Sequence, residues 1–157
     1  MTDGVNLKKA QSVYKSLCDM LDEKKVRYEK HPEDLVVTFT MTGEDIPMNF
    51  ILNIDAKRDL VRLISPIPVK FEGDKRVIGA IATCQATYCL ADGSFDYDCK
   101  SGNVLFRMTS SYKDSLISKD VLEYMVAVAG MTVDEFNDKF LMLAKGVLSI
   151  EDFLKQN

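Results

Sequence analysis

The stretch Asp74 to Leu90, DKRVIGAIATCQATYCL, has three charged residues at its start and no charged residue after them. Its apolar side chains recur at helical spacing and fall on nearly every side of the helical axis. A helix that is apolar on all sides is normally buried on all sides. We therefore expect this helix to lie at the centre of the fold, covered by its own chain or by a partner.

The segment that follows this helix, Ala91 to Met108, alternates in polarity. Phe95 and Tyr97 point one way while Asp96 and Asp98 point the other, and the alternation resumes after Lys-Ser-Gly. This pattern predicts a β-hairpin. A calcium loop needs a glycine at its sixth position and a glutamate at its twelfth, and neither is present. We expect Asp96 and Asp98 to bind no ion, and their replacement by Asn to change stability by no more than about 0.5 kcal/mol.

The chain before the central helix reads as three strands. Apolar residues alternate over Leu35 to Met41 and over Met48 to Ile54, with Gly-Glu-Asp between the two runs, and Leu60 to Ile64 forms a third run. Pro66 and Pro68 then withhold two backbone donors, so the sheet is expected to stop there.

Three further helical regions are predicted. Asn6 to Lys24 has its apolar residues on one face, and Ser118 to Ala129 is apolar over its second half. Gly130 is expected to break or bend the chain, because Thr132 begins a capping-box spacing that would start a new helix. Ser149 opens a last short helix.

The composition favours one domain spanning residues 1–157, since 157 residues with 46% apolar side chains can bury a sizeable core. The net charge is −4 and basic residues are scattered, which argues against a nucleic-acid partner. No apolar run reaches the roughly 20 residues that a bilayer span needs, so no membrane partner is expected. The first residues have no signal-peptide pattern, which predicts a cytoplasmic protein.

Catalytic and cofactor motifs are absent from the sequence. Neither a dinucleotide fingerprint nor a phosphate-binding loop occurs, and we expect no cofactor and no enzymatic activity. One alternative stays open: a cysteine-dependent enzyme or metal-binding protein using Cys84, Cys89, Cys99 and His31. The spacing of these residues lacks the paired-cysteine pattern of most zinc sites.

Several short motifs, in this order and spacing, resemble the YbjN-like bacterial family, whose members share a fold with type III secretion chaperones. They are Ser65-Pro66, Asp74-Lys-Arg76, Tyr88-x-Leu90-x-x-Gly93-Ser-Phe95-Asp-x-Asp98, Gly102-x-x-x-Phe106-Arg107 and Gly146-x-x-Ser149-x-Glu151. The family often has asparagine where this chain has Thr87.

The resemblance implies an α+β fold of the type III secretion chaperone kind. The element order would be α-β-β-β-α-β-β-α, with helices packed on an antiparallel five-stranded sheet and an extra C-terminal helix. It also implies a homodimer that binds another polypeptide and has no catalytic residues. Proteins of this family are described as sensory-transduction regulators, so a chaperone-like adaptor or a regulator is expected.

The central helix is the predicted self-association surface, because small residues beside apolar ones let another backbone come close. The predicted surface consists of Ile78, Gly79, Ala82, Thr83, Ala86 and Cys89. An intramolecular helix pair, with the third helix covering the second, would use the same residues. Ala82→Glu distinguishes the two arrangements, since a seam residue predicts a folded monomer.

Overall fold

The computed structural model describes residues 6–157, which form one antiparallel sheet and four helices. The elements are α1 (Leu7–Glu23), β1 (Glu29–His31), β2 (Val36–Met41), β3 (Met48–Asp55), β4 (Leu60–Lys70), α2 (Lys75–Tyr88), β5 (Ser94–Tyr97), β6 (Asn103–Ser111), α3 (Lys119–Lys145) and α4 (Ile150–Gln156). The α+β class, both hairpins and the extra C-terminal helix are as predicted.

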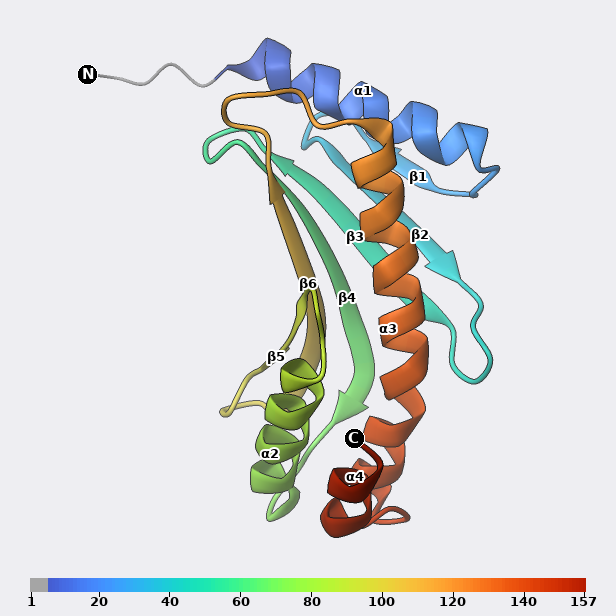
Figure 1. Ribbon diagram of the computed structural model, residues 1–157, viewed down its shortest axis with the longest axis vertical. Coiled ribbons are helices and arrows are strands. Elements are labelled where there is room, and N and C mark those ends of the chain that lie inside the picture. The colour runs from blue at the N-terminus through green and yellow to red at the C-terminus, as the bar shows by residue number, and fades with distance from the viewer. Residues whose placement is uncertain (1–5) are drawn as a thin grey trace, which may run out of the picture.

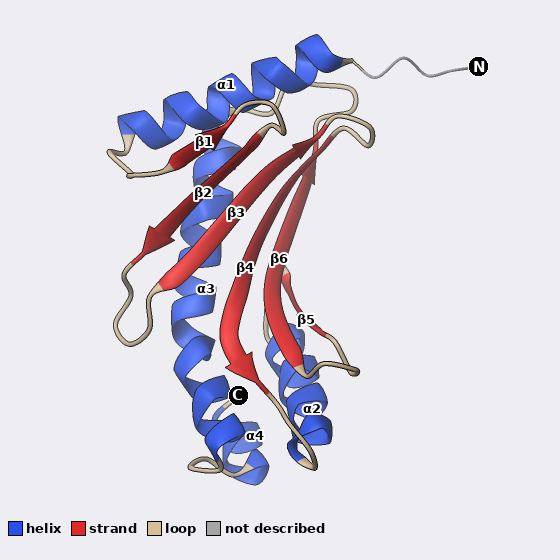
Figure 2. Cartoon of the chain, turned by 180° about the vertical axis from the view of Figure 1, so that it is seen from behind, coloured by secondary structure: helices blue, strands red, loops and turns tan. Residues whose placement is uncertain are grey.

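The sheet has the strand order β1-β2-β3-β4-β6-β5, and each neighbouring pair is antiparallel. Helix α1 crosses one end of the sheet, and α3 runs along the length of one face (Figure 1). Helices α2 and α4 lie at the other end, beside β5 and the C-terminal part of α3. Seen from behind, the strands lie in front of α3, so the sheet's other face is not covered by that helix (Figure 2).

The core lies between the sheet and the helices. Alternate residues of β2, β3, β4 and β6 point toward the helices and are buried, while the residues between them are half-buried or exposed. This period of two is the pattern that predicted the strands. The largest fully buried strand residues are Phe50, Phe106, Leu52 and Leu63.

The sheet has six strands, so the predicted number of five is wrong. The additional strand is β1, which pairs with Val36, Val37 and Thr38 of β2. It has only three residues, all polar and none buried. A strand with no buried side chain has no hydrophobic alternation, so the pattern could not reveal it.

Strand β4 also differs from its prediction, because it continues through Pro66 and Pro68 to Lys70. Its pairing with β3 ends at Ile64, and its pairing with β6 is irregular between Pro66 and Lys70. Both prolines therefore lie where the hydrogen-bond ladder is already incomplete, and their missing donors cost little there.

Helix α3 is continuous, so the predicted break at Gly130 is wrong. Gly130 is buried within the helix, and a side-chain carbon added there would lie 3.3 Å from the Met41 methyl group. A glycine inside a helix costs about 1 kcal/mol relative to alanine, and packing against the sheet offsets that cost here. The capping-box spacing at Thr132 is consequently not used as a helix start.

Candidate functional site: the outer face of helix α2

The inner side of α2 holds the small residues that the sequence singled out. Gly79, Ala82, Thr83 and Ala86 are buried within a single chain, where α2 packs against β5, α3 and α4. A side-chain carbon added at Gly79 would lie 2.6 Å from the ring of Phe71. These residues pack the helix against its own protomer. This agrees with the intramolecular helix packing that the sequence left open as an alternative. Ile78 is half-buried and Cys89 is exposed.

Polar contacts fix both ends of α2. At its start, Lys75 donates from Nζ to the Ala144 carbonyl oxygen at 2.8 Å, which joins the helix to the C-terminal end of α3. At its end, the Thr87 hydroxyl oxygen accepts from the Phe95 backbone N–H at 2.9 Å and lies 3.3 Å from the Phe95 carbonyl oxygen. A threonine at this position therefore ties α2 to β5.

The outer side of α2 is apolar and uncovered in a single chain. Val77 is 67% exposed, Ile81 43% and Tyr88 85%, and Cys84 is also exposed. A single chain therefore covers only one side of the helix, and cover for the other side by a partner stays a prediction. Leu154 of α4, 43% exposed, joins this surface across a shallow hollow of about 370 Å³. We call Val77, Ile81, Cys84, Tyr88 and Leu154 the outer face.

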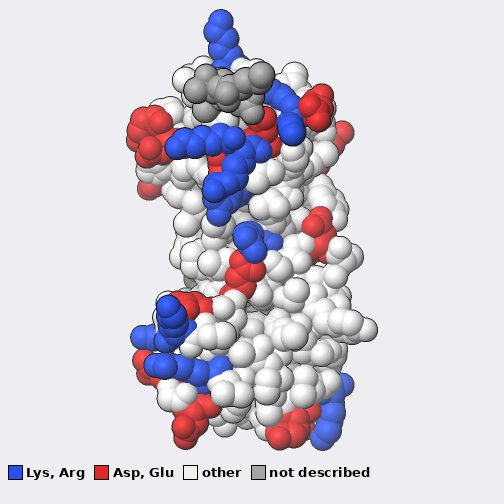
Figure 3. All heavy atoms as spheres, turned by 90° about the vertical axis from the view of Figure 1, so that its left-hand side faces the viewer, with Lys and Arg blue, Asp and Glu red and all other residues white. Residues whose placement is uncertain are grey.

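Charged side chains are sparse on this side of the molecule. Figure 3 views the side on which α2 lies and shows a broad area without charge on the right of its lower half, while acidic and basic groups lie near the two ends, near the middle and along the left margin. No charged residue occurs between Arg76 and Asp92 in the sequence. A contiguous apolar area of this kind on a small protein is typical of an interaction surface.

The aspartates of the second hairpin serve the hairpin itself. Asp96 pairs with Arg107 on the neighbouring strand at 2.9 Å. Asp98 lies one residue beyond β5, where it accepts hydrogen bonds from the Lys100 backbone N–H at 2.9 Å and the Ser101 hydroxyl at 2.7 Å. The predicted turn is present, but Asp98 caps this turn instead of occupying the polar face of a strand.

Asp98→Asn should make stability less dependent on pH. The Ser101 hydroxyl, followed by the Lys100 backbone N–H, lowers the pKa of Asp98 below its usual value. The ionised side chain therefore stabilises the folded state above about pH 4, the ordinary aspartate pKa, and this stabilisation is lost as the pH falls through the folded-state value. Melting temperatures measured at pH 7 and pH 3 should differ less for Asp98→Asn than for the wild type. Equal differences in the two proteins would contradict this role.

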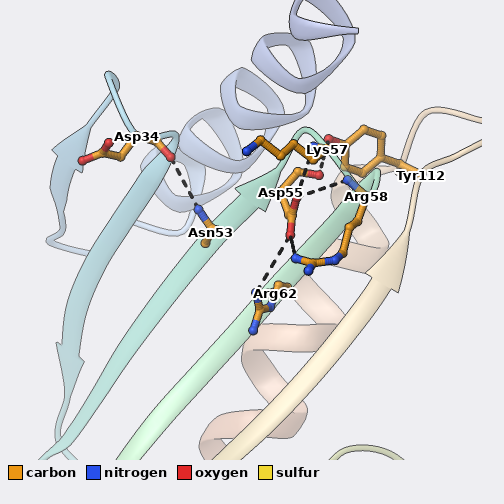
Figure 4. Close-up of polar contacts among 7 residues, drawn as sticks. All are labelled: Asp34, Asn53, Asp55, Lys57, Arg58, Arg62 and Tyr112. Atoms are coloured by element: carbon orange, nitrogen blue, oxygen red, sulfur yellow. Dashed lines mark hydrogen bonds and ion pairs between the residues drawn. The ribbon is translucent and has the colours of Figure 1, made fainter. Parts of the chain in front are cut away.

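A second polar cluster closes the turn between β3 and β4. The Asp55 carboxylate accepts from the backbone N–H groups of Lys57 and Arg58, both at 3.1 Å, and from the Arg58 guanidinium at 2.9 Å (Figure 4). Burial raises the pKa of Asp55, but the Arg58 and Lys57 hydrogen bonds outweigh it and lower the pKa overall. Arg62 lies 3.9 Å from the same carboxylate. These contacts occupy the carboxylate within the turn, so the cluster is structural.

The residues of the alternative hypothesis are not brought together in one chain. His31 lies on β1 at one edge of the sheet, and Cys99 follows β5 at the opposite edge. At about 4.8 Å per strand and five spacings, these edges are roughly 24 Å apart. Across residues 6–157, no group of three or more His, Cys, Asp or Glu side chains is placed to hold a metal ion.

None of the helices within residues 6–157 has the length and apolar character that crossing a membrane requires.

Comparison with known proteins identifies the fold. No protein-family model matches the chain, and no curated protein matches it, so kinship with the YbjN-like family stays a prediction. Two solved structures are similar. The ExsC–ExsE complex matches with a TM-score of 0.58 at 14% identity, over 83% of this chain and 94% of that chain. The HopA1–SchA chaperone–effector complex matches with a TM-score of 0.51 at 18% identity, over the same shares of the two chains. The chain has the fold of type III secretion chaperones.

Proposed function

We propose that this chain is a non-enzymatic protein-binding module, a chaperone-like adaptor or regulator. It pairs with itself through the outer face of α2 and holds a segment of another polypeptide. The observation that carries this proposal is the outer face itself, a row of large apolar side chains on a helix whose opposite side is already packed against its own chain.

Self-pairing suits the chemistry of the outer face. In a two-fold pair the same patch meets itself, so any charge near the axis would face an identical charge. The outer face has no charged member, and burying apolar surface stabilises the pair by about 25 cal/mol per Å². Beside Ile81, the half-buried Ala80 and the exposed Cys84 are small and allow close approach of a second helix.

The two similar structures support a polypeptide partner, since each is a complex between two different proteins and one is described as a chaperone with its effector. In this chain, β1 pairs with β2 only as far as Thr38, which leaves the outer edge of Phe39 to Met41 without a strand partner. A hollow of about 580 Å³ lies beside this edge, lined by residues such as Arg27, Thr40 and Asn49. An unpaired edge next to a polar-lined hollow suits an extended segment.

Ile81→Asp should separate the pair without unfolding the chain. Ile81 is partly exposed in one protomer, so a charge there remains hydrated in the monomer but would be buried without a partner in the pair. We expect the variant to sediment as a monomer with a melting temperature close to that of the folded wild-type protomer. Met131→Asp is the control, because Met131 is 67% exposed on α3 and lies outside the outer face. Dimeric Ile81→Asp, or a monomeric wild type at high concentration, would contradict self-pairing.

The second part of the proposal concerns the other polypeptide. Affinity capture with the wild-type chain from its source cells, followed by identification of the bound protein, tests it. The captured protein should bind the purified chain directly at one segment. Failure of every captured protein to bind the purified chain would contradict a polypeptide-holding role.

A further inference from the structure

Helix α4 is attached to the rest of the molecule by very few groups. It has seven residues, and Phe153 is its only buried side chain. At its end, the Asn157 carbonyl oxygen accepts from the Gln85 amide at 2.9 Å, and the Asn157 side-chain oxygen accepts from the Lys139 ammonium at 3.0 Å. Phe153, the half-buried Leu148 and Ile150, and the last residue therefore hold the helix in place.

Phe153 rests on an aromatic cluster formed by other elements. Its ring centroid lies 6.1 Å from that of Phe140 and 6.5 Å from that of Phe136, both on α3. Phe95 of β5 lies beneath them, 5.0 Å from Phe140 and 5.4 Å from Phe136. We call Phe95, Phe136 and Phe140 the aromatic seat. Its three rings come from β5 and α3, so the seat is built without any contribution from α4.

The packing of α4 against the molecule is weaker than the packing of the core that it covers. A helix of seven residues is not stable in isolation, so its order depends on the Phe153 contact and the bonds at Asn157. Segments with one buried side chain and an exposed backbone open locally far more often than the whole domain unfolds. The link from α3 to α4 includes Gly146 and Val147, and Val147 is 75% exposed.

Two basic side chains lie near the seat, and α4 carries acidic ones, of which Asp152 pairs with Lys155 of the same helix. The Lys139 ammonium lies 4.9 Å from the centre of the Phe136 ring, and the Lys75 ammonium lies beside the linker at Gly146. Helix α4 carries Glu151 and Asp152 in its first turn. The resident helix thus indicates what the seat accepts: a short helical segment with one aromatic anchor and acidic residues.

We propose that α4 is a displaceable strap, and that the aromatic seat beneath it is a second binding site for an acidic helical segment of a partner polypeptide with an aromatic anchor. This proposal rests on the polypeptide-holding part of the proposed function. Such a segment would compete with Phe153 for the seat. The apparent affinity of the site is therefore lower than its intrinsic affinity, in proportion to the fraction of molecules whose seat is free of α4. Displacing α4 would also move Leu154 away from the outer face of α2, which links the two surfaces.

A labelled peptide with the sequence of residues 147–157 tests this site in the full-length protein. Phe153→Ala removes the resident anchor, and the variant should bind the peptide at least about tenfold more tightly than the wild type, because self-competition is lost. Leu154→Ala is the matched control: Leu154 is the exposed neighbour in the same helix, and its loss should leave peptide affinity at the wild-type value. A second peptide in which alanine replaces the phenylalanine should not bind any of the three proteins.

Three results would overturn the strap. The first is a folded Phe153→Ala protein that binds the peptide no better than Leu154→Ala does. The second is a Phe153→Ala chain that fails to fold, since Phe153 would then be part of the domain core. The third is hydrogen exchange in α4 as slow as in the buried half of α3. The peptide assay needs no captured partner, so failure of the strap is distinguishable from failure of the polypeptide-holding role. All three measurements can also be made on Ile81→Asp protein, which separates them from self-pairing.

Discussion

Ala82→Glu is expected to unfold the protein. Ala82 is fully buried on the inner side of α2, where the helix packs against β5, α3 and α4. A glutamate at this position would place an unpaired carboxylate among apolar groups, at a cost of about 3–5 kcal/mol. A domain of this size is stable by roughly 5–15 kcal/mol, so this loss is a large share of the stability and is enough to unfold a domain at the lower end of that range.

The measurement is a thermal melt followed by circular dichroism, with Ile81→Glu as the control. Ile81 is the preceding residue and points outward, so the same charge there should leave the melt of the protomer nearly unchanged. A folded monomer from Ala82→Glu, as expected for a seam residue, would contradict the burial of Ala82 within one chain. The same charge at the adjacent positions 81 and 82 therefore tests assembly and folding separately.

Gly102→Ala is expected to lower the free energy of unfolding by about 2–4 kcal/mol, because it strains the backbone and displaces core packing. Gly102 has φ +77°, and an added side-chain carbon would lie 1.9 Å from the Phe71 carbonyl oxygen. The Gly102 carbonyl oxygen also accepts from the Phe71 backbone N–H at 2.9 Å. The chain at Phe71 would have to move, and the Phe71 ring packs against Gly79 of α2.

Gly73→Ala is the control for Gly102→Ala. Gly73 also has a positive φ, +56°, but an added carbon would meet nothing within 4 Å. Its cost should be the backbone strain alone, about 1 kcal/mol. Urea unfolding of both variants measures the difference between them. Equal losses of stability in the two variants would contradict a steric cost from the contact with Phe71.

The sequence predicted those elements whose side chains alternate between core and solvent. Strands β2, β3 and β6 have buried residues at every second position, and α1 has one apolar face, so periodicity located all four. Strand β1 is held by backbone pairing and not by a hydrophobic pattern. The end of β4 keeps its alternation at Ile67 and Val69, but Pro66 and Pro68 argued against a strand there. Helix α3 continues through Gly130, which lies close to Met41, a residue 89 positions earlier, and local spacing cannot reveal such a contact.

For the candidate site, the sequence identified the correct helix but could not separate its two sides. Gly79, Ala82 and Ala86 line one side and Val77 and Ile81 the other, and both sets are uncharged. Hydrophobicity alone therefore does not say which side meets the protomer. Residue size carries the missing signal, since close packing against Phe71 requires glycine at position 79. The contribution of Leu154 depends on the placement of α4, which no local pattern specifies.

The central claim is that the outer face of α2 packs against itself. Sedimentation velocity of Ile81→Lys, of Ile81→Asp and of their equimolar mixture tests it most directly, because opposite charges brought together in a two-fold pair attract while like charges repel. Each variant alone should sediment as a monomer near 17.7 kDa, and the mixture should form a species of about twice that mass. A mixture that behaves like its separate components, or single variants that stay dimeric, would contradict the claim.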